Sequence, residues 1–220
     1  MRNKLALLLG TVTALTAAAP ADATIFEIYI RGDAGFEYLD MTALDYAGAL
    51  NPANYDTLPT SEQQIIDNAT KNYSGEGWAV GGSAGVMLFD FIDLGVDFRQ
   101  AGLAFDSGVA ADLTQLVFHA AWHILGSELI ADPSLLLGFG YSYLTTPSIG
   151  LSPAGDQAVP GPEVTTNGFV ARAGAALDIR FISWMSVGIV ADFSFLYFDA
   201  GENTSWGFNT DILGRISFHI

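Results

Sequence analysis

The sequence predicts an all-β protein: an eight-stranded antiparallel, up-and-down transmembrane β-barrel that follows an N-terminal signal peptide. Three observations lead to this prediction. The first residues have the order of an export signal, apolar and less apolar residues alternate in eight later segments, and no run of 18 apolar residues follows residue 23. A chain that is 50% hydrophobic without such a run must bury its apolar groups by alternation.

The N-terminus has the three parts of a signal peptide. Arg2 and Lys4 form a short basic region, residues 5–15 are almost wholly apolar, and a small-residue stretch ends in Ala21-Asp22-Ala23. The apolar part is too short to span a bilayer, which takes about 20 residues, and the A-x-A ending is typical of a cleavage site. We therefore expect residues 1–23 to be a signal peptide and residues 24–220 to be one barrel domain.

Period-two alternation begins directly after the predicted cleavage site. In residues 25–39, Phe26, Ile28 and Ile30 share one face, and Glu27, Tyr29 and Arg31 share the other. This pattern indicates a strand with two unlike faces, and its length suits a membrane-crossing strand of about 9–11 residues. Similar segments follow at 77–89, 92–105, 113–124, 135–145, 166–180, 183–197 and 206–220.

The connections between these segments alternate in length. Short turns are expected near 90–91, 126–133 and 180–183, whereas the other links cover 40–76, 106–112, 145–165 and 199–205. With both termini in the periplasm, every turn of the first set lies there and the other links lie outside, as in bacterial barrels. In the longest link, Thr60-Ser61-Glu62-Gln63 is typical of the start of a short helix.

The two faces differ in side-chain size as well as polarity. One carries glycine, alanine, serine and charged groups, which suit a narrow lumen, and the other carries large apolar groups, which suit lipid. A soluble barrel or sandwich stays the alternative, because period two does not say which face meets solvent. Aromatic girdles are expected from Trp78, Tyr141, Tyr143, Trp206 and Phe218.

Charged residues recur on the face assigned to the lumen. Isolated charges in a narrow lumen are costly, so we expect them to pair with each other or to meet water. An ion-pair network that plugs the barrel is one interpretation, and a gated path for ions or a ligand is the other. The lumen set consists of Glu27, Arg31, Asp33, Glu37, Asp97, Arg99, Arg172, Asp178, Asp192, Asp211 and Arg215, with His119, His123 and His219 beside them.

The last strand alternates up to the C-terminus, with Ile216, Phe218 and Ile220 on its apolar face. This ending, "LLLGFGYSYL" at 135–144 and "IYIRGDAGFEYL" at 28–39 together resemble small outer-membrane barrels of the OmpA/OmpX/OmpW-like kind. The resemblance covers residues 24–220, although those proteins usually end in an aromatic residue and not in isoleucine. It implies a bacterial outer-membrane location and a C-terminal assembly signal that the outer-membrane assembly machinery reads.

Two motifs that could carry chemistry fit the strands better. Ser83 stands in a G-x-S-x-G motif, but the nucleophile elbow needs a strand that turns sharply into a helix, and another alternating segment follows instead. His119 and His123 suit one zinc ion on a helix, whereas on a strand they lie about 13 Å apart. We therefore predict no enzyme, no catalytic residue, no metal site and no cofactor.

Composition limits the partners. With 8 basic and 24 acidic residues the net charge is −16, which argues against nucleic acid, and without cysteine there is no disulfide.

We expect a structural or cell-surface interaction role through acidic extracellular loops, with lipid and an extracellular ligand or divalent cations as partners. A narrow OmpW-like channel for small or apolar solutes is the alternative. The acidic outer residues are Asp40, Asp45, Asp56, Glu62, Asp67, Glu76, Asp156, Glu163, Asp199 and Glu202.

Overall fold

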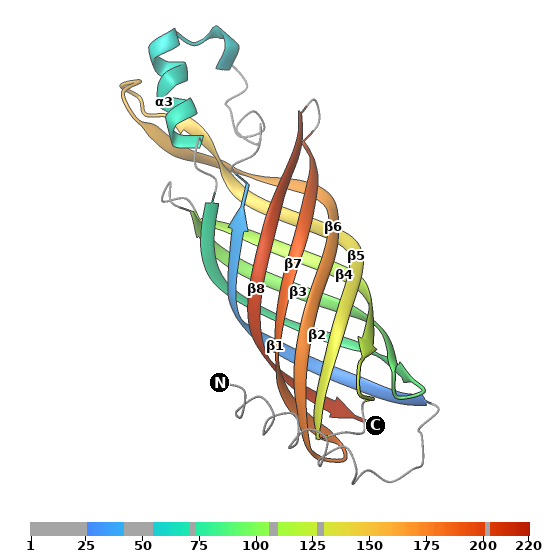
Figure 1. Cartoon of the computed structure of the whole chain (residues 1–220). Helices are drawn as coiled ribbons and strands as arrows, with labels where there is room; N and C mark the ends of the chain where they lie inside the picture. The colour runs from blue at the N-terminus through green and yellow to red at the C-terminus, as the bar shows by residue number, and fades with distance from the viewer. Residues whose placement is uncertain (1–25, 42–54, 71–73, 106–109, 127–129, 201–202) are drawn as a thin grey trace, which may run out of the picture.

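Eight antiparallel strands close into one barrel (Figure 1). The computed structural model describes residues 26–41, 55–70, 74–105, 110–126, 130–200 and 203–220, so the predicted signal peptide lies outside the described residues. The strands are β1 (Phe26–Asp40), β2 (Ser74–Leu88), β3 (Ile92–Phe105), β4 (Ala110–His123), β5 (Ala131–Leu151), β6 (Ala158–Ile182), β7 (Met185–Ala200) and β8 (Asn203–His219).

Each strand pairs with its sequence neighbours, and β8 pairs with β1 to close the ring. At the seam, the Ile220 N–H donates to the Ile28 carbonyl at 2.8 Å, and the Ile28 N–H donates to the Ile220 carbonyl at 3.1 Å. Closure leaves no open sheet edge along the barrel, which is a requirement for strands in a lipid environment. The predicted eight-stranded, up-and-down topology is confirmed.

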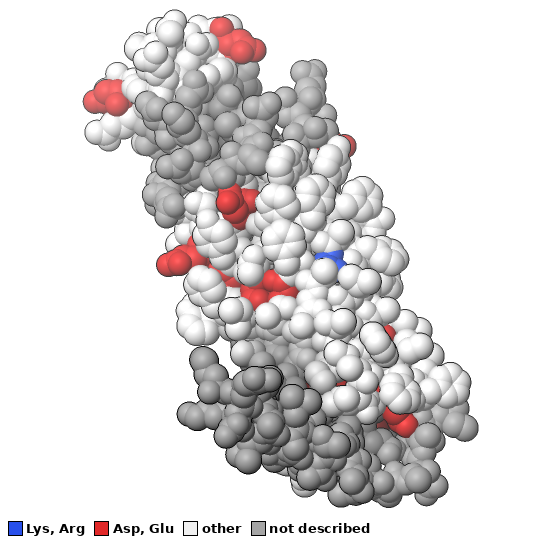
Figure 2. All heavy atoms as spheres, in the orientation of Figure 1, with Lys and Arg blue, Asp and Glu red and all other residues white. Residues whose placement is uncertain are grey.

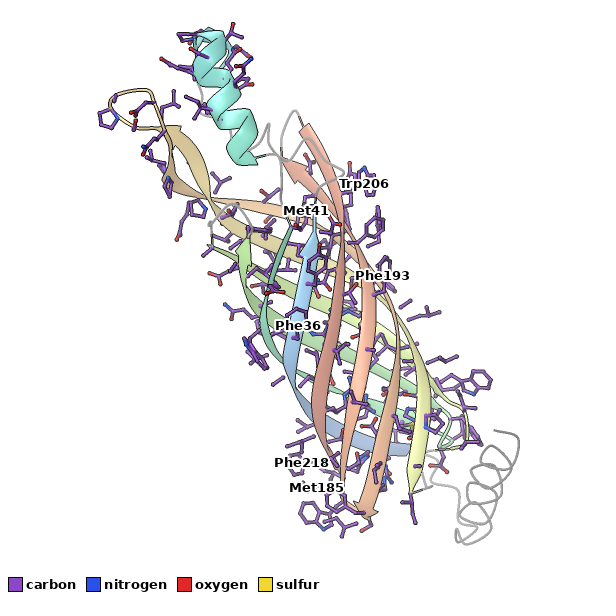
Figure 3. All side chains as sticks on the ribbon, turned by 60° about the vertical axis from the view of Figure 1, so that its left-hand side comes forward. Phe36, Met41, Met185, Phe193, Trp206 and Phe218 are labelled. Atoms are coloured by element: carbon purple, nitrogen blue, oxygen red, sulfur yellow. The ribbon has the colours of Figure 1, made fainter. Side chains whose placement is uncertain are left out.

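The alternation has the polarity expected of a membrane barrel. On β1, Tyr29 and Arg31 are buried inside, whereas Phe26 and Ile30 are 53% and 52% exposed on the outer wall. Figure 3 shows Phe193 and Trp206 on the outside of the barrel, with Met185 and Phe218 near the end opposite α3. The soluble alternative is therefore wrong, because the large apolar side chains face outward while the charged ones are buried.

The predicted link at 145–165 is mostly strand. β5 continues to Leu151 and β6 begins at Ala158, so only a tight turn at 152–157 separates them. The two strands stay hydrogen-bonded beyond the barrel, and the hydroxyl groups of Thr145 and Thr165 lie 3.0 Å apart across them. The sequence reasoning stopped each strand at the membrane boundary, but a hairpin can extend outside the membrane as long as its two strands pair.

The short helix predicted at Thr60 is confirmed as α3 (Thr60–Thr70), which follows the 3-10 turn η1 (Tyr55–Thr57). No described helix is long and apolar enough to cross a membrane. α3 lies beside the outer ends of β5 and β6 (Figure 1), and its Ile66 is fully buried. Because the short turns of bacterial barrels lie on the periplasmic side, we assign the end with α3 to the outside and call α3, η1 and the β5–β6 ribbon beyond Thr145 and Thr165 the extracellular knob.

The inside of the barrel is divided along its length. Charged side chains are concentrated in its periplasmic and middle parts, where the buried apolar cluster includes only smaller contributions such as Ala176, Val190 and Leu213. At its extracellular end the cluster contains the large apolar side chains that Ile66 and Met41 join. The sequence reasoning did not anticipate this cluster. We call it the apolar plug, and its main members are Leu39, Leu103, Phe105, Leu113, Leu144 and Phe198.

Candidate functional site

At the periplasmic mouth, three strand ends bring together Glu27, Arg180 and His219. Arg180 donates to both carboxylate oxygens of Glu27, at 2.9 and 3.3 Å. His219 Nδ1 lies 2.5 Å from the same carboxylate, and its Nε2 lies 3.1 Å from the Ser186 hydroxyl. Because the side chains of Arg180 and Glu27 are each 13% exposed, this cluster borders the periplasm.

Deeper in the lumen, Asp93 is the shared acceptor of a second cluster. Arg31 donates to its Oδ2 at 2.5 Å, and the Tyr29 hydroxyl donates to its Oδ1. His119 Nε2 lies 3.0 Å from the Tyr29 hydroxyl and 3.5 Å from Asp93 Oδ1. The Arg31 guanidinium also stacks 3.7 Å from the centre of the Tyr29 ring. Strands β1, β3 and β4 are thereby connected through polar groups that are almost fully buried.

His123 joins a different carboxylate, because its Nδ1 lies 2.6 Å from Asp132 Oδ2. The two histidines are on one face of β4, and Asp93 lies between them, 3.5 Å from His119 Nε2 and 3.9 Å from His123 Nε2. In the part of the chain that the structure describes, no group of three or more histidine, aspartate or glutamate residues has the geometry to hold a metal ion. Both histidines therefore lie beside lumen carboxylates.

The middle of the lumen is crossed by Arg172 and Arg99. Arg172 donates to Gln115 Oε1, and to Asp97 Oδ2 at 3.3 Å. Arg99 donates to Asp211 at 2.5 Å and to Asp192 at 3.1 Å. These bonds run between non-adjacent strands across the lumen.

Two further pairs lie in the lumen. Arg215 donates from Nε to Asp33 Oδ1 at 2.7 Å, which joins the neighbouring strands β8 and β1. Glu37 accepts a hydrogen bond from Asn209; both side chains are buried, and Asn209 lies beside Leu39 of the apolar plug. Every residue of the lumen set named from the sequence lies on the lumen side, with Glu27 alone at the mouth.

Three lumen ionic residues were missed by the sequence reasoning: Asp93, Asp132 and Arg180. Asp93 is four residues from Asp97 on β3, so the period-two pattern places both side chains on the lumen face. Asp132 and Arg180 were assigned to turns, but β5 and β6 extend far enough to bring both into the lumen.

The lumen is narrow where it opens to the periplasm. The cavity among Arg31, His123, Asp178, Arg180 and His219 has a volume of about 10 Å³, which is close to the minimum that holds one water molecule. Ser83 lies in the middle of β2, which continues as a strand to Leu88, so no sharp strand-to-helix turn follows it. The geometry of a nucleophile elbow is therefore absent at Ser83.

The outer wall bears the expected aromatic residues. Trp78, Tyr141, Tyr143, Trp206 and Phe218 are all exposed there, between 39% and 74%. Figure 2 shows a wall made mainly of uncharged side chains, in which blue is confined to a small spot. An exposed apolar surface of this extent requires lipid around it.

No protein-family model and no curated protein matches the sequence. Solved structures do match. Neisserial surface protein A superposes with a TM-score of 0.59 at 9% identity, covering 87% of this chain and 96% of that one. The N-terminal barrel of Pseudomonas aeruginosa OprF has a TM-score of 0.42 at 14% identity (88% and 97% covered), and Ail of Yersinia pestis has 0.39 at 13% identity (89% and 98% covered).

The chain has the fold of the small outer-membrane β-barrels. This conclusion rests on its own closed ring and lipid-facing wall and on the superposition with Neisserial surface protein A. The bacterial outer membrane is the location that this fold and wall fit.

Proposed function

We propose that this barrel is a closed, rigid support that holds the extracellular knob at the cell surface for interaction with other molecules. The observation that carries the proposal is the apolar plug. Leu39, Leu113 and Leu144 are at most 1% exposed inside the extracellular end of the lumen, and an apolar constriction of this kind excludes water and ions.

The ion pairs of the lumen support the same role. Arg99 and Arg172 each bond across the barrel to strands that are not their neighbours, and such bonds resist changes in the cross-section. Buried ion pairs are weak evidence for stability by themselves, but here the arginine side chains are almost fully buried between the strands that they connect. A lumen filled with fixed charges and closed by apolar groups suits a scaffold better than a channel.

Packing and hydrogen bonds hold the knob in one conformation, as an interaction platform requires. Ile66 of α3 is fully buried, and Tyr55, Leu58 and Leu151 pack around the same cluster. At the ribbon tip, the Gly155 N–H donates to the Ser152 carbonyl at 2.8 Å.

The ribbon edges are protected against pairing with other strands. β5 loses its β4 partner after Thr145, and β6 has no β7 partner before Asn167. Pro147, Pro160 and Pro162 lie in these unpaired stretches and lack the N–H group that an added strand would need. The knob is therefore suited to recognition by side chains and not to strand addition.

Exposed acidic residues give the outer end of the protein a negative charge, which is part of this proposal. Asp56, Asp156 and Glu163 are exposed outside or at the edge of the barrel, where divalent cations or a basic ligand are the partners that charge favours. The prediction that the acidic outer residues lie in loops was wrong for four of them, which lie on β1, β2, β6 and β7: Asp40, Glu76, Glu163 and Asp199. We further propose that Ile216, Phe218 and Ile220 serve as the assembly signal, since they line the lipid face of the closing strand.

Two measurements test the proposal. Refolded mature protein in planar bilayers should show no steady single-channel conductance. In the second measurement, cells that display the native protein should attach to a surface more than cells that display a variant in which a tight turn joins Thr145 to Thr165 and replaces the ribbon. Steady conductance would show that the lumen is open and favour the channel alternative. Equal attachment by both kinds of cell would show that the knob is not the interacting part.

A further inference from the structure

A groove of about 720 Å³ lies on the outside of the barrel wall, across the extracellular ends of β2, β3 and β4. Phe36 and Trp78 form its apolar side, and Glu76, Asp112 and Glu163 add three carboxylates to its lining. The groove therefore offers an apolar surface and negative charge side by side.

The floor of the groove is open above Gly102. Trp78, Gly102 and Asp112 are in register on three neighbouring strands, and a Cβ atom built on Gly102 would meet only Asp112 Oδ1, at 3.8 Å. Side chains in register on adjacent strands stand about 5 Å apart, so the missing side chain leaves a space between an indole ring and a carboxylate. Trp78 is 74% exposed toward this space.

The groove coincides with the upper boundary of the apolar wall. On β3 and β4, Phe98 and Leu116 are paired, exposed and apolar, and the next outward pair is Gln100 with Thr114. Beyond that pair the outward positions hold Gly102 and then alanine. A molecule in the groove would therefore have lipid-facing wall directly below it and polar surface around it.

No positive charge of the described chain neutralises this groove. Glu76, Asp112 and Glu163 make no ion pair with any described residue. The described arginines all point into the lumen or lie at its periplasmic mouth. Within the described residues, the three carboxylates are therefore left without a balancing cation.

We propose that this groove binds the ammonium head group of a membrane lipid, with its acyl chains continuing down over Phe98 and Leu116. An ammonium group beside the face of an exposed tryptophan is held by cation–π attraction, and the nearby carboxylates add charge complementarity. The position at the lipid boundary and the volume, which is in the range of small-molecule sites, favour a lipid over a protein segment. A lone divalent cation is disfavoured, since the carboxylates do not converge on one point within the described residues.

The test is native mass spectrometry of the refolded mature protein with lipids that share the same acyl chains. Phosphatidylethanolamine should be retained about fivefold better than its N-acetylated form or phosphatidylglycerol, because only the first carries an ammonium group. Trp78→Leu and Asp112→Asn should each reduce this preference about threefold. Gly102→Leu should abolish it by filling the open space.

The matched controls are Trp206→Leu, which removes a girdle ring elsewhere on the wall, and Asp156→Asn, which removes a carboxylate at the ribbon tip. Both should keep the full preference, and far-UV circular dichroism should show that every variant is folded. Equal retention of the three lipids by the native protein would overturn the proposal. The proposal would also be overturned if calcium ions alone, or a decalysine peptide, bound the native protein in preference to the amine lipid, and if this binding disappeared in the Asp112→Asn variant.

Discussion

Replacing Arg99 by methionine should destabilise the barrel more than any exposed substitution on the same strand. Arg99 is 2% exposed and donates to two carboxylates, Asp211 at 2.5 Å and Asp192 at 3.1 Å. These two acids are cross-strand neighbours on β7 and β8, so without the guanidinium two buried like charges would face each other. The cost therefore comes from the carboxylates left behind as much as from the lost bonds.

The magnitude follows from the contacts. Hydrogen bonds to charged groups contribute about 1.5–3 kcal/mol each, and removing one partner of a buried ion pair costs about 3–5 kcal/mol. We expect Arg99→Met to lower the free energy of unfolding by about 3–5 kcal/mol. A triple variant that adds Asp192→Asn and Asp211→Asn should recover most of this loss, since no unpaired charge remains.

Reversible urea unfolding in lipid vesicles, followed by tryptophan fluorescence, measures these free energies. The control is Gln100→Met, which places the same side chain on the next residue, where it points outward; its effect should stay within about 0.5 kcal/mol. A loss below about 1 kcal/mol for Arg99→Met would refute the reasoning, because it would mean that water reaches the two carboxylates. A triple variant no more stable than the single one would refute it as well.

Three further predictions concern the plug, a turn and the ribbon edge. Leu144→Ala, at a fully buried plug position, should lower the free energy of unfolding by about 2–4 kcal/mol in the same urea assay; an unchanged value would mean that the plug is loosely packed. Gly126→Ala should cost about 1–2 kcal/mol because Gly126 has a φ of 88°, while the nearest atom to an added Cβ is 3.6 Å away; a neutral result would show that the turn can relax. Pro160→Thr should increase self-association in analytical ultracentrifugation by giving the ribbon edge a free N–H group, and an unchanged monomer would show that the edge is protected in another way.

The lumen residues show how far sequence reasoning reaches. Arg31, Asp97 and Arg172 could be assigned to the inside by parity alone, because a strand places alternate side chains on opposite faces. Their partners could not be assigned. Arg172 contacts Asp97, which is 75 residues away, and that contact depends on strand stagger and on which strands face each other across the closed barrel.

The apolar plug and the groove illustrate the same limit. Leu39, Leu113 and Leu144 follow the inward parity of their strands, yet nothing in the local pattern indicates that inward apolar residues from distant strands meet at one level. Likewise, Gly102 and Trp78 are ordinary members of two strands until the register places them side by side. Contacts between strands are set by register, which a single sequence does not specify.

The sequence by itself determined the strand number and the division of each strand into a large apolar face and a face of small and charged residues, because these depend on the two-residue period of a strand. That the apolar face is the outer wall was decided by the structure, since the period does not say which face meets solvent. Only the tertiary structure decided the ion-pair partners, the closure of the lumen by the plug, the hairpin extension with α3 and the groove at Trp78. Each of these depends on side chains far apart in sequence, and the closed barrel alone brings them into contact.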